Sequence, residues 1–366
     1  MIIKSIVPVG IAAPLIEPIK MAKSQHTSAK SMLVRIEDTD GNTGWGEASE
    51  APMMNGETVP GMIAAVLYLV PLLEGLEIPD PQIFVDIVKP MIVGNHGAIA
   101  ALDIAIYDLA GKRDRLPVYE LLGGKKRDYV SALWMLAANE IEKDTLTARR
   151  KSQEGFSAFK IKAGINAISD DLDRCRAVRK VVGTFPRISA DANMGLTFED
   201  AIEFAQAAQS AGIDFIEQPI DSNDLSGMAH INAAAGPAGV CADEGIRSLS
   251  DITRHFETKA ATGVGLKAIK LGGLTRMLEA ANSANDLKLH VNIAGKVAET
   301  AVASAAIIHL AVAAPQVDWD ISVTCQYVAR DVAENPPTAV NGKLNVQDAP
   351  GLGIRIDEQA IEGMII

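Results

Sequence analysis

Cysteine is scarce in this 366-residue chain, and its three cysteines lie far apart. Cys175, Cys241 and Cys325 form no CxxC pair, which argues against a disulfide framework and against a cysteine-ligated zinc site. Such a chain suits a reducing compartment, so we expect it in the cytoplasm. The N-terminus also lacks the basic and then apolar order of a signal peptide, and we expect no secretory leader.

Long apolar runs and clusters of basic residues are also missing. The longest apolar run, residues 62–73, is too short to cross a bilayer and contains Pro71, so we expect no membrane partner. The net charge is −12, and basic residues gather only in short pairs such as Arg149-Arg150. A protein that binds a phosphate backbone needs clustered cations, and this chain has none. The charge therefore argues against nucleic acid as a partner and favours small-molecule chemistry.

The composition is that of a globular protein with a large core. Apolar residues make up 48% of the chain and charged residues 22%. A chain of this length exceeds the size at which one core usually keeps growing, so we expect one large domain and a smaller companion.

The N-terminal third mixes strands with helices. Residues 2–11 and 31–37 predict two antiparallel strands, and amphipathic patterns predict helices over 61–73 and 98–113. We therefore predict an α+β domain over residues 1–125.

From about residue 126, short apolar strands alternate with amphipathic helices, which is typical of βα units around a parallel sheet. Eight such strands would close an α/β barrel over residues 126–329, and the turn-rich residues 330–366 are expected to rejoin the first domain. The predicted strands are 130–136, 158–162, 188–191, 215–217, 240–243, 268–271, 289–293 and 317–320.

Three carboxylates stand at equal intervals at the ends of successive predicted strands. Asp191, Glu217 and Asp243 are each 26 residues apart, and parallel strand ends in a barrel converge on one mouth. Three acids there would repel one another unless a hard cation lay between them, and oxygen ligands favour Mg²⁺ or Mn²⁺. The alternative is that they are helix N-caps or surface acids.

Lysines accompany these acids. Lys160 and Lys162 share one face of their strand, and a barrel whose outer face must be apolar turns that face inward. Lys270, at the end of the predicted sixth strand, is expected across the mouth from Lys162. Two lysines facing each other over a metal suit removal of a weakly acidic α-proton. The alternatives are a solvated strand face for the first pair and a simple ion pair between Lys270 and Glu244.

Five motifs in this order resemble the enolase superfamily, in particular its muconate lactonizing enzyme subgroup within the mandelate racemase/muconate lactonizing enzyme family. The resemblance covers almost the whole chain and implies a (β/α)7β-type TIM barrel under an α+β capping domain that the C-terminal tail completes. The motifs are Lys160-Ile161-Lys162, Asp191-Ala192-Asn193, Glu217-Gln218-Pro219, Ala242-Asp243-Glu244 and Ile269-Lys270-Leu271-Gly272-Gly273.

The resemblance also implies roles for single residues. It makes Asp191, Glu217 and Asp243 the ligands of Mg²⁺ and makes Lys162 and Lys270 the acid/base pair. Other implied roles are assistance by the charge of Lys160 and orientation of the metal or a lysine by Asn193 and Glu244. The family resemblance further implies a homo-oligomer, with an octamer among the possible states.

Substrate contacts are expected from side chains around the mouth, on the cap loop and on the late strands. These candidates are His26, Trp134, Asn292, Asp318 and Asp320. The eighth predicted strand resembles the muconate lactonizing enzymes at Asp318-Trp319 but then departs, because Ser322 stands where an acid is expected. His290 lies near the start of the seventh strand instead of its end, which disfavours the mandelate racemase and glucarate dehydratase subgroups.

The sequence thus predicts an isomerase, either a racemase, an epimerase or a cycloisomerase, that takes an α-proton from a small carboxylate substrate. The same lysine pair would serve a dehydratase or a lyase of the succinylbenzoate synthase type, which is the first alternative. A non-catalytic metal or metabolite binder is the second alternative, and the lysines argue against it because their charges oppose cation binding.

Overall fold

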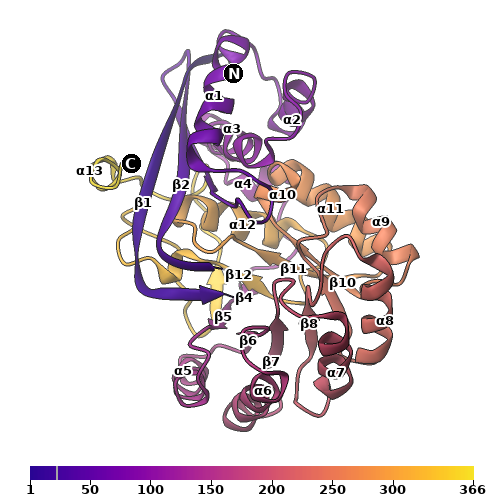
Figure 1. The fold of residues 1–366 in the computed structure, drawn as a ribbon. Helices are drawn as coiled ribbons and strands as arrows, with labels where there is room; N and C mark the ends of the chain where they lie inside the picture. The colour runs from indigo at the N-terminus through magenta and orange to yellow at the C-terminus, as the bar shows by residue number, and fades with distance from the viewer. Residues whose placement is uncertain (22–23) are drawn as a thin grey trace.

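A computed structural model describes residues 1–21 and 24–366, and it shows a cap seated on one side of a barrel (Figure 1). The cap opens with three antiparallel strands in the order β1-β2-β3, of which the first two form a long hairpin. These strands are β1 (Ile3–Met21), β2 (Ser24–Asp38) and β3 (Thr43–Ser49). The cap helices are α1 (Val59–Leu73), the 3₁₀ turn η1 (Pro81–Ile83), α2 (Phe84–Val88), α3 (His96–Asp114) and α4 (Val118–Leu121).

Two glycines in β3 let the buried helix α3 lie directly on the cap sheet. A Cβ on Gly44 would lie 2.2 Å from the carbonyl oxygen of Ala105, and one on Gly46 would lie 1.8 Å from that of Ala101. No side chain fits at such distances, so glycine permits the close backbone approach. The core of the cap forms where α1 and α3 pack on this sheet.

The barrel consists of eight parallel strands in sequential order. A parallel bridge between Ala132 and Ile321 joins the last strand to the first and closes the ring. The strands are β5 (Leu133–Leu136), β6 (Ala158–Lys162), β7 (Arg187–Asp191), β8 (Phe215–Glu217), β9 (Val240–Ala242), β10 (Gly263–Leu266), β11 (His290–Ala294) and β12 (Ile321–Ser322).

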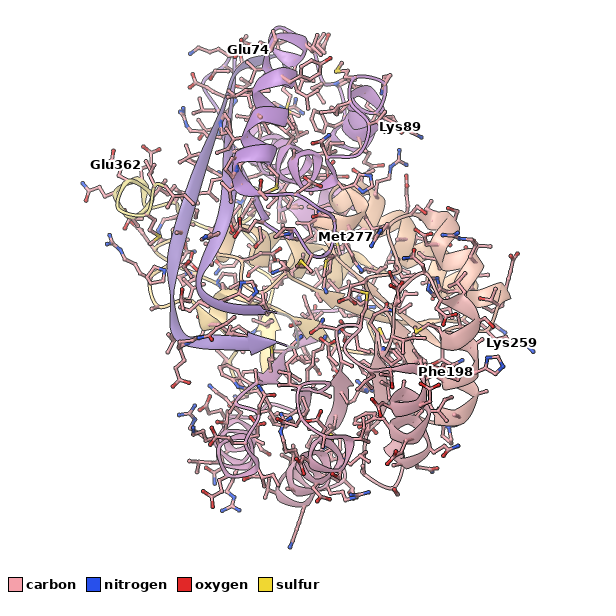
Figure 2. All side chains as sticks on the ribbon, viewed as in Figure 1. Glu74, Lys89, Phe198, Lys259, Met277 and Glu362 are labelled. Atoms are coloured by element: carbon pink, nitrogen blue, oxygen red, sulfur yellow. The ribbon has the colours of Figure 1, made fainter. Side chains whose placement is uncertain are left out.

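Helices surround the strands, and Figure 2 shows side chains filling the space between the ribbons of the barrel and the cap. Capping side chains fix several helix starts; Thr197, for example, accepts the backbone N–H of Asp200 at the start of α7. The helices are α5 (Ile141–Gln153), α6 (Ile168–Val182), α7 (Phe198–Ala208), α8 (Leu225–Ala235), α9 (Leu249–Glu257), α10 (Ala268–Leu271), α11 (Leu274–Asp286), α12 (Ala301–Ala313) and the 3₁₀ turn η2 (Cys325–Tyr327).

Buried acids of the cap hold the first turns of two barrel helices. The Glu47 carboxylate accepts the backbone N–H groups of Thr300 and Ala303 and the Thr300 hydroxyl at the start of α12. Asp103 accepts the N–H groups of Leu274 and Thr275 at the start of α11. Helix N-termini attract acids because their first N–H groups have no partner within the helix. These contacts fasten the cap to the barrel.

The C-terminal residues return to both parts of the molecule. Strand β13 (Lys343–Asn345) pairs with β4 (Tyr129–Ser131) beside the barrel. After helix α13 (Glu358–Glu362), the chain ends beside β1, where Ile366 donates its N–H to Gly10 (Figure 1). The return of the tail to the cap is therefore confirmed, whereas the domain limits 1–125 with 330–366 and 126–329 stay a prediction.

Most predicted barrel strands are confirmed within a few residues, but two are wrong. Residues 268–271 form the helical turn α10, and the sixth strand is the preceding Gly263–Leu266. The eighth strand is Ile321–Ser322, just after the predicted residues 317–320. Both shifts change which side chains reach the mouth of the barrel.

Candidate active site

The strand register places the key side chains in one layer at the carboxyl ends of the barrel strands. Lys162, the last residue of β6, lies beside Asp191, the last residue of β7. Asp191 in turn lies beside Glu217, the last residue of β8. Asp243 follows β9 directly. The convergence of the three acids that their spacing predicts is confirmed, and each is at most 2% exposed, which excludes surface acids.

These strand ends open into a cavity of about 170 Å³. Its wall combines charged side chains with apolar ones, several of which are methionines. The charged and polar lining residues are His26, Lys160, Lys162, Asp191, Asn193, Glu217, Glu244, Lys267, Lys296 and Ser322. The apolar ones include Ala51, Pro52, Met53, Met54, Met135, Met194 and Val297.

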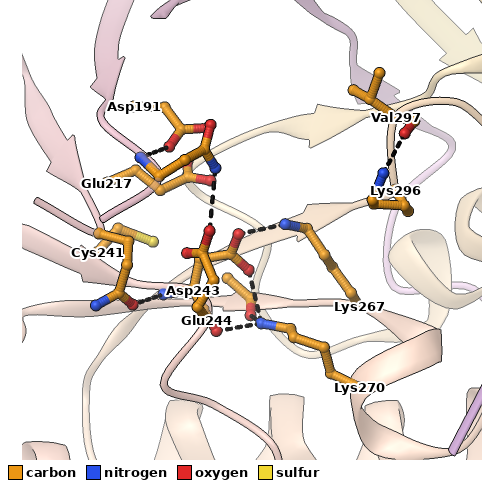
Figure 3. Close-up of polar contacts among 12 residues, drawn as sticks. Asp191, Glu217, Cys241, Asp243, Glu244, Lys267, Lys270, Lys296 and Val297 are labelled. Carbon is orange, nitrogen blue, oxygen red and sulfur yellow. Dashed lines mark hydrogen bonds and ion pairs between the residues drawn. The ribbon is translucent and has the colours of Figure 1, made fainter. Parts of the chain in front are cut away.

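Lysines neutralise the acids one by one. Lys160 Nζ lies 2.5 Å from Glu217 Oε2, and Lys162 Nζ lies 2.5 Å from Asp191 Oδ2. Asp243 receives two ammonium groups, one from Lys267 on Oδ2 and one from Lys270 on Oδ1 at 2.6 Å (Figure 3). Buried charges are tolerated only when they are paired in this way.

Burial and these charges set the ionisation of the site. Burial raises the pKa of Asp191, but Lys162 and Lys160 outweigh it and hold that pKa below its usual range. Burial likewise works against ionisation of Asp243, and Lys267 and Lys270 again lower its pKa well below the ordinary value. In Glu244, burial dominates, helped by the charge of Asp243, and raises the pKa to about 7.

Asn193 links a lysine to an acid. Its Oδ1 accepts a hydrogen bond from Lys162 Nζ at 2.8 Å, and its Nδ2 donates to Glu244 Oε1 at 3.1 Å. Gln218 holds Asp243 in place, because its side-chain oxygen accepts the N–H groups of Asp243 and Gly245. Asn193 and Glu244 thus lie beside the lysine and the acids, while their role in orienting a metal or a lysine stays a prediction.

Lys270 is not at the mouth of the barrel, so the predicted position is wrong. It belongs to helix α10, is 1% exposed and is absent from the cavity wall. Its ammonium group donates to Asp243 Oδ1 and to the carbonyl oxygens of Asp243 and Gly265. The cause is the misplaced sixth strand, and the alternative pairing with Glu244 is also wrong, since Lys270 pairs with Asp243.

Two lysines that the sequence analysis missed occupy the cavity instead. Lys267 directly follows β10, and Lys296 follows β11 by two residues. Burial lowers the pKa of Lys267, but Asp243 and Glu244 outweigh burial and raise it above the ordinary value. The sequence position of Lys267 could have predicted this place, because a residue directly after a barrel strand lies at the mouth of the barrel.

Of the five expected substrate contacts, only His26 lies on the cavity wall of the described residues. It belongs to β2, and burial, together with Lys296 and Lys162, lowers its pKa to about 4. Trp134 packs against Phe156 and Tyr327 and lines a separate hollow. Asn292 is fully buried and donates to the carbonyl oxygens of Trp319 and Asp320.

The aspartates Asp318 and Asp320 lie at the opposite end of the barrel. Asp318 contacts His290, the first residue of β11, and Asp320 pairs with Arg187, the first residue of β7, at 2.6 Å. Both precede β12, so they enter the barrel at its amino-terminal end. Their predicted contact with substrate is therefore wrong.

The donor set at the mouth has the chemistry of a hard-cation site, since it consists of carboxylate oxygens. Glu244 Oε2 is buried there without a hydrogen-bond partner among the described residues. Within residues 1–21 and 24–366, however, no three His, Cys, Asp or Glu side chains stand together as a ready metal site. The acids are paired with lysines instead, so a cation would replace ammonium groups as their partner.

The fold and this cavity define a capped α/β barrel with an acid- and lysine-lined site, and two family models match it. "Mandelate racemase / muconate lactonizing enzyme, N-terminal domain" covers residues 6–123, and "Enolase C-terminal domain-like" covers residues 144–360. The chain therefore belongs to the enolase superfamily, in the group that resembles the muconate lactonizing enzymes.

Named relatives extend over nearly the whole chain. A hydrophobic dipeptide epimerase of Citrifermentans bemidjiense is 30% identical over 94% of this chain and 95% of its own length. Muconate cycloisomerase 1 of Acinetobacter baylyi is 28% identical over 98% of each chain. The structure of a muconate lactonizing enzyme from Pseudomonas fluorescens superposes with a TM-score of 0.96 at 28% identity, over 100% of this chain and 99% of the other. These relatives are isomerases, which places this chain among the isomerases of the superfamily.

No helix in the part of the chain that the structure describes combines the length and the apolar character needed to cross a bilayer.

Proposed function

We propose that this chain is a racemase, epimerase or cycloisomerase that moves the proton on the carbon next to a substrate carboxylate, with Lys162 and Lys267 as its acid and base. The observation that carries the proposal is the position of these two lysines on one small cavity. Lys267 takes the role that the sequence analysis gave to Lys270.

The strand order supports opposite positions for the two lysines. Lys162 ends β6 and Lys267 follows β10, and these are the second and the sixth of eight strands around a closed ring. They therefore approach the cavity from opposite sides of the barrel axis. A carbon held between them can lose a proton to one lysine and gain one from the other, which inverts its configuration.

The other charged groups orient the substrate and the lysines. The Lys160 ammonium next to Lys162 adds positive charge where the substrate carboxylate would lie, and Asn193 fixes Lys162 by accepting its hydrogen bond. Asp191, Glu217 and Asp243 would hold Mg²⁺ or Mn²⁺, which would neutralise the negative charge that grows on the substrate carboxylate as the proton leaves.

Proton NMR in D₂O tests the proposal directly. The enzyme with Mg²⁺ is incubated with N-acyl amino acids, dipeptides, hydroxy acids and unsaturated diacids, and loss of the α-proton signal is followed. The wild-type chain should exchange the α-proton of at least one class, whereas Lys162→Ala and Lys267→Ala should lose at least about 100-fold in rate, as expected for removal of a general acid or base.

A matched control and the product mass give the result its meaning. Lys180→Ala removes an exposed lysine outside the cavity and should keep the wild-type rate. When the same reaction is run in H₂O, a product with the substrate's mass supports an isomerase, and loss of water identifies a lyase instead. Unchanged exchange in both cavity variants would refute the acid/base assignment.

The remaining expectations about assembly and location are proposals on the same footing. We propose a homo-oligomer, which light scattering would test, and a cytoplasmic enzyme, which fractionation would test.

A further inference from the structure

Lys296 is the cavity lysine without an ion pair among the described residues, and the carboxylates of Glu299 and Glu50 act on it only from a longer distance. Lys160, Lys162 and Lys267 each have an Asp or Glu oxygen within ion-pair distance. Among the described residues, Lys296 has none; its ammonium group donates to the carbonyl oxygen of the next residue, Val297. Figure 3 shows it apart from the carboxylate cluster, on the far side of Lys267 from Asp191.

The side chain is nevertheless deeply buried. Only 8% of Lys296 is exposed, and it forms part of the cavity wall. Burial, followed by repulsion from Lys267, lowers its pKa to about 8. A buried cation that lacks an anionic partner is costly, so its retention at this point favours an anion that arrives from outside.

The acid nearest in sequence does not meet this need. Glu299 lies beneath Gly295, where an added Cβ would come within 2.5 Å of Glu299 Oε2. Burial and the neighbouring Glu47 raise the pKa of Glu299 to about 8, so its carboxyl group is mainly protonated and neutral at pH 7. His26, which also lines the cavity, is neutral at that pH and supplies no negative charge.

We propose that Lys296 binds a second acidic group of the substrate, at the end of the cavity away from Asp191 and Glu217. This inference rests on the proposed function, because it assumes that the reacting carboxylate lies among the paired lysines. Apart from these charged groups, the wall of the cavity is largely apolar and includes Met53, Met135 and Val297. The substrate class is therefore a small diacid whose two acidic groups are joined by a short, largely apolar segment.

Binding measurements with matched pairs of acids test this inference without relying on turnover. Isothermal titration compares adipate with hexanoate, and N-succinylglycine with N-butanoylglycine, in the presence of Mg²⁺. A charge-assisted hydrogen bond in a buried site predicts that the diacid of at least one pair binds the wild-type chain about 10- to 100-fold more tightly. Lys296→Met should abolish that preference and leave the affinity for the monoacid unchanged.

Two further variants separate charge from packing. Lys296→Arg keeps the positive charge and should retain a preference for the diacid. Lys30→Met removes a nearby cation that is 51% exposed and lies outside the cavity wall, and it should behave as the wild type. Circular dichroism of each variant verifies folding before titration.

The outcomes distinguish this inference from the proposed function. An equal affinity of the wild-type chain for both members of each pair, or a diacid preference that survives in Lys296→Met, would overturn the role of Lys296. Exchange of an α-proton in a monoacid by the same wild-type preparation would then still support the acid/base chemistry. A clear diacid preference without any proton exchange would support Lys296 and count against the proposed reaction.

Discussion

Lysines 267 and 270 both contact Asp243, and their replacement by methionine should have opposite consequences. Lys267 lines the cavity, so Lys267→Met should reduce α-proton exchange by about 10²- to 10⁴-fold, as for loss of a general acid or base. The fold should tolerate this change, because Lys270 still neutralises Asp243.

Lys270→Met should instead weaken the fold. The variant loses an ion pair with Asp243 at 2.6 Å and a hydrogen bond to the Gly265 carbonyl oxygen at 2.9 Å, in a place that is 1% exposed. Removing one partner of a buried ion pair costs about 3–5 kcal/mol, a large share of the roughly 5–15 kcal/mol that stabilises a typical domain. A strong loss of soluble protein would be an extreme form of the same result.

Urea unfolding and NMR exchange in D₂O measure the two effects on the same preparations. The expected pattern is a stable but inactive Lys267→Met and an unstable Lys270→Met. The reasoning is refuted if Lys270→Met keeps wild-type stability and loses exchange while Lys267→Met remains active. That pattern would return the acid/base role to Lys270.

Two other predictions concern the cation and pH. Prolonged chelation should abolish α-proton exchange until Mg²⁺ is restored. Mg²⁺ should also raise the Tm of the wild-type chain but not that of Glu217→Gln. Equal Tm shifts in both proteins would contradict a ligand role for Glu217. Burial lowers the pKa of His309 to about 4 from 6.5, and its Nδ1 accepts the Tyr119 N–H at 3.2 Å. The imidazole of His309 therefore binds a proton more tightly in the unfolded chain than in the folded one. Its contribution to the free energy of unfolding is fully present above pH 6.5 and falls by about 3 kcal/mol towards pH 4. Urea denaturation at a series of pH values should show that the free energy of unfolding falls less steeply below pH 6.5 in His309→Gln than in the wild type. An identical pH dependence of both proteins would contradict this role of His309.

The acids of the site could be predicted from the sequence because strand periodicity and equal spacing define them. In the strands that Asp191 and Glu217 end, the residues just before these acids are apolar or small, and the register then fixes their neighbours. Lys160 and Lys162 could be predicted as well, since the outer face of a barrel strand must be apolar. Both lysines are buried in the structure, at 5% and 4% exposure, as this argument requires.

The sixth strand escaped prediction for a physical reason. Its sequence, Gly263-Val264-Gly265-Leu266, contains two glycines, which weaken the usual strand signal. The neighbouring Ala268-Ile269-Lys270-Leu271, which has no glycine, attracts the assignment but forms a helical turn. Tertiary contacts stabilise that turn, because His96 and Asn55 of the cap contact the carbonyl oxygens of Lys270 and Ile269. Such distant contacts leave no local pattern in the sequence.

The attachment of the cap has a consequence for engineering this molecule. Asp103 holds the start of α11, which lies a few residues after Lys267, and Glu47 holds the start of α12, a few residues after Lys296. The spacing of two cavity lysines is thus tied to two anchor points outside the barrel. A cap transplanted from a relative would have to carry acids at both anchor points, or the barrel beneath it would present its lysines out of alignment.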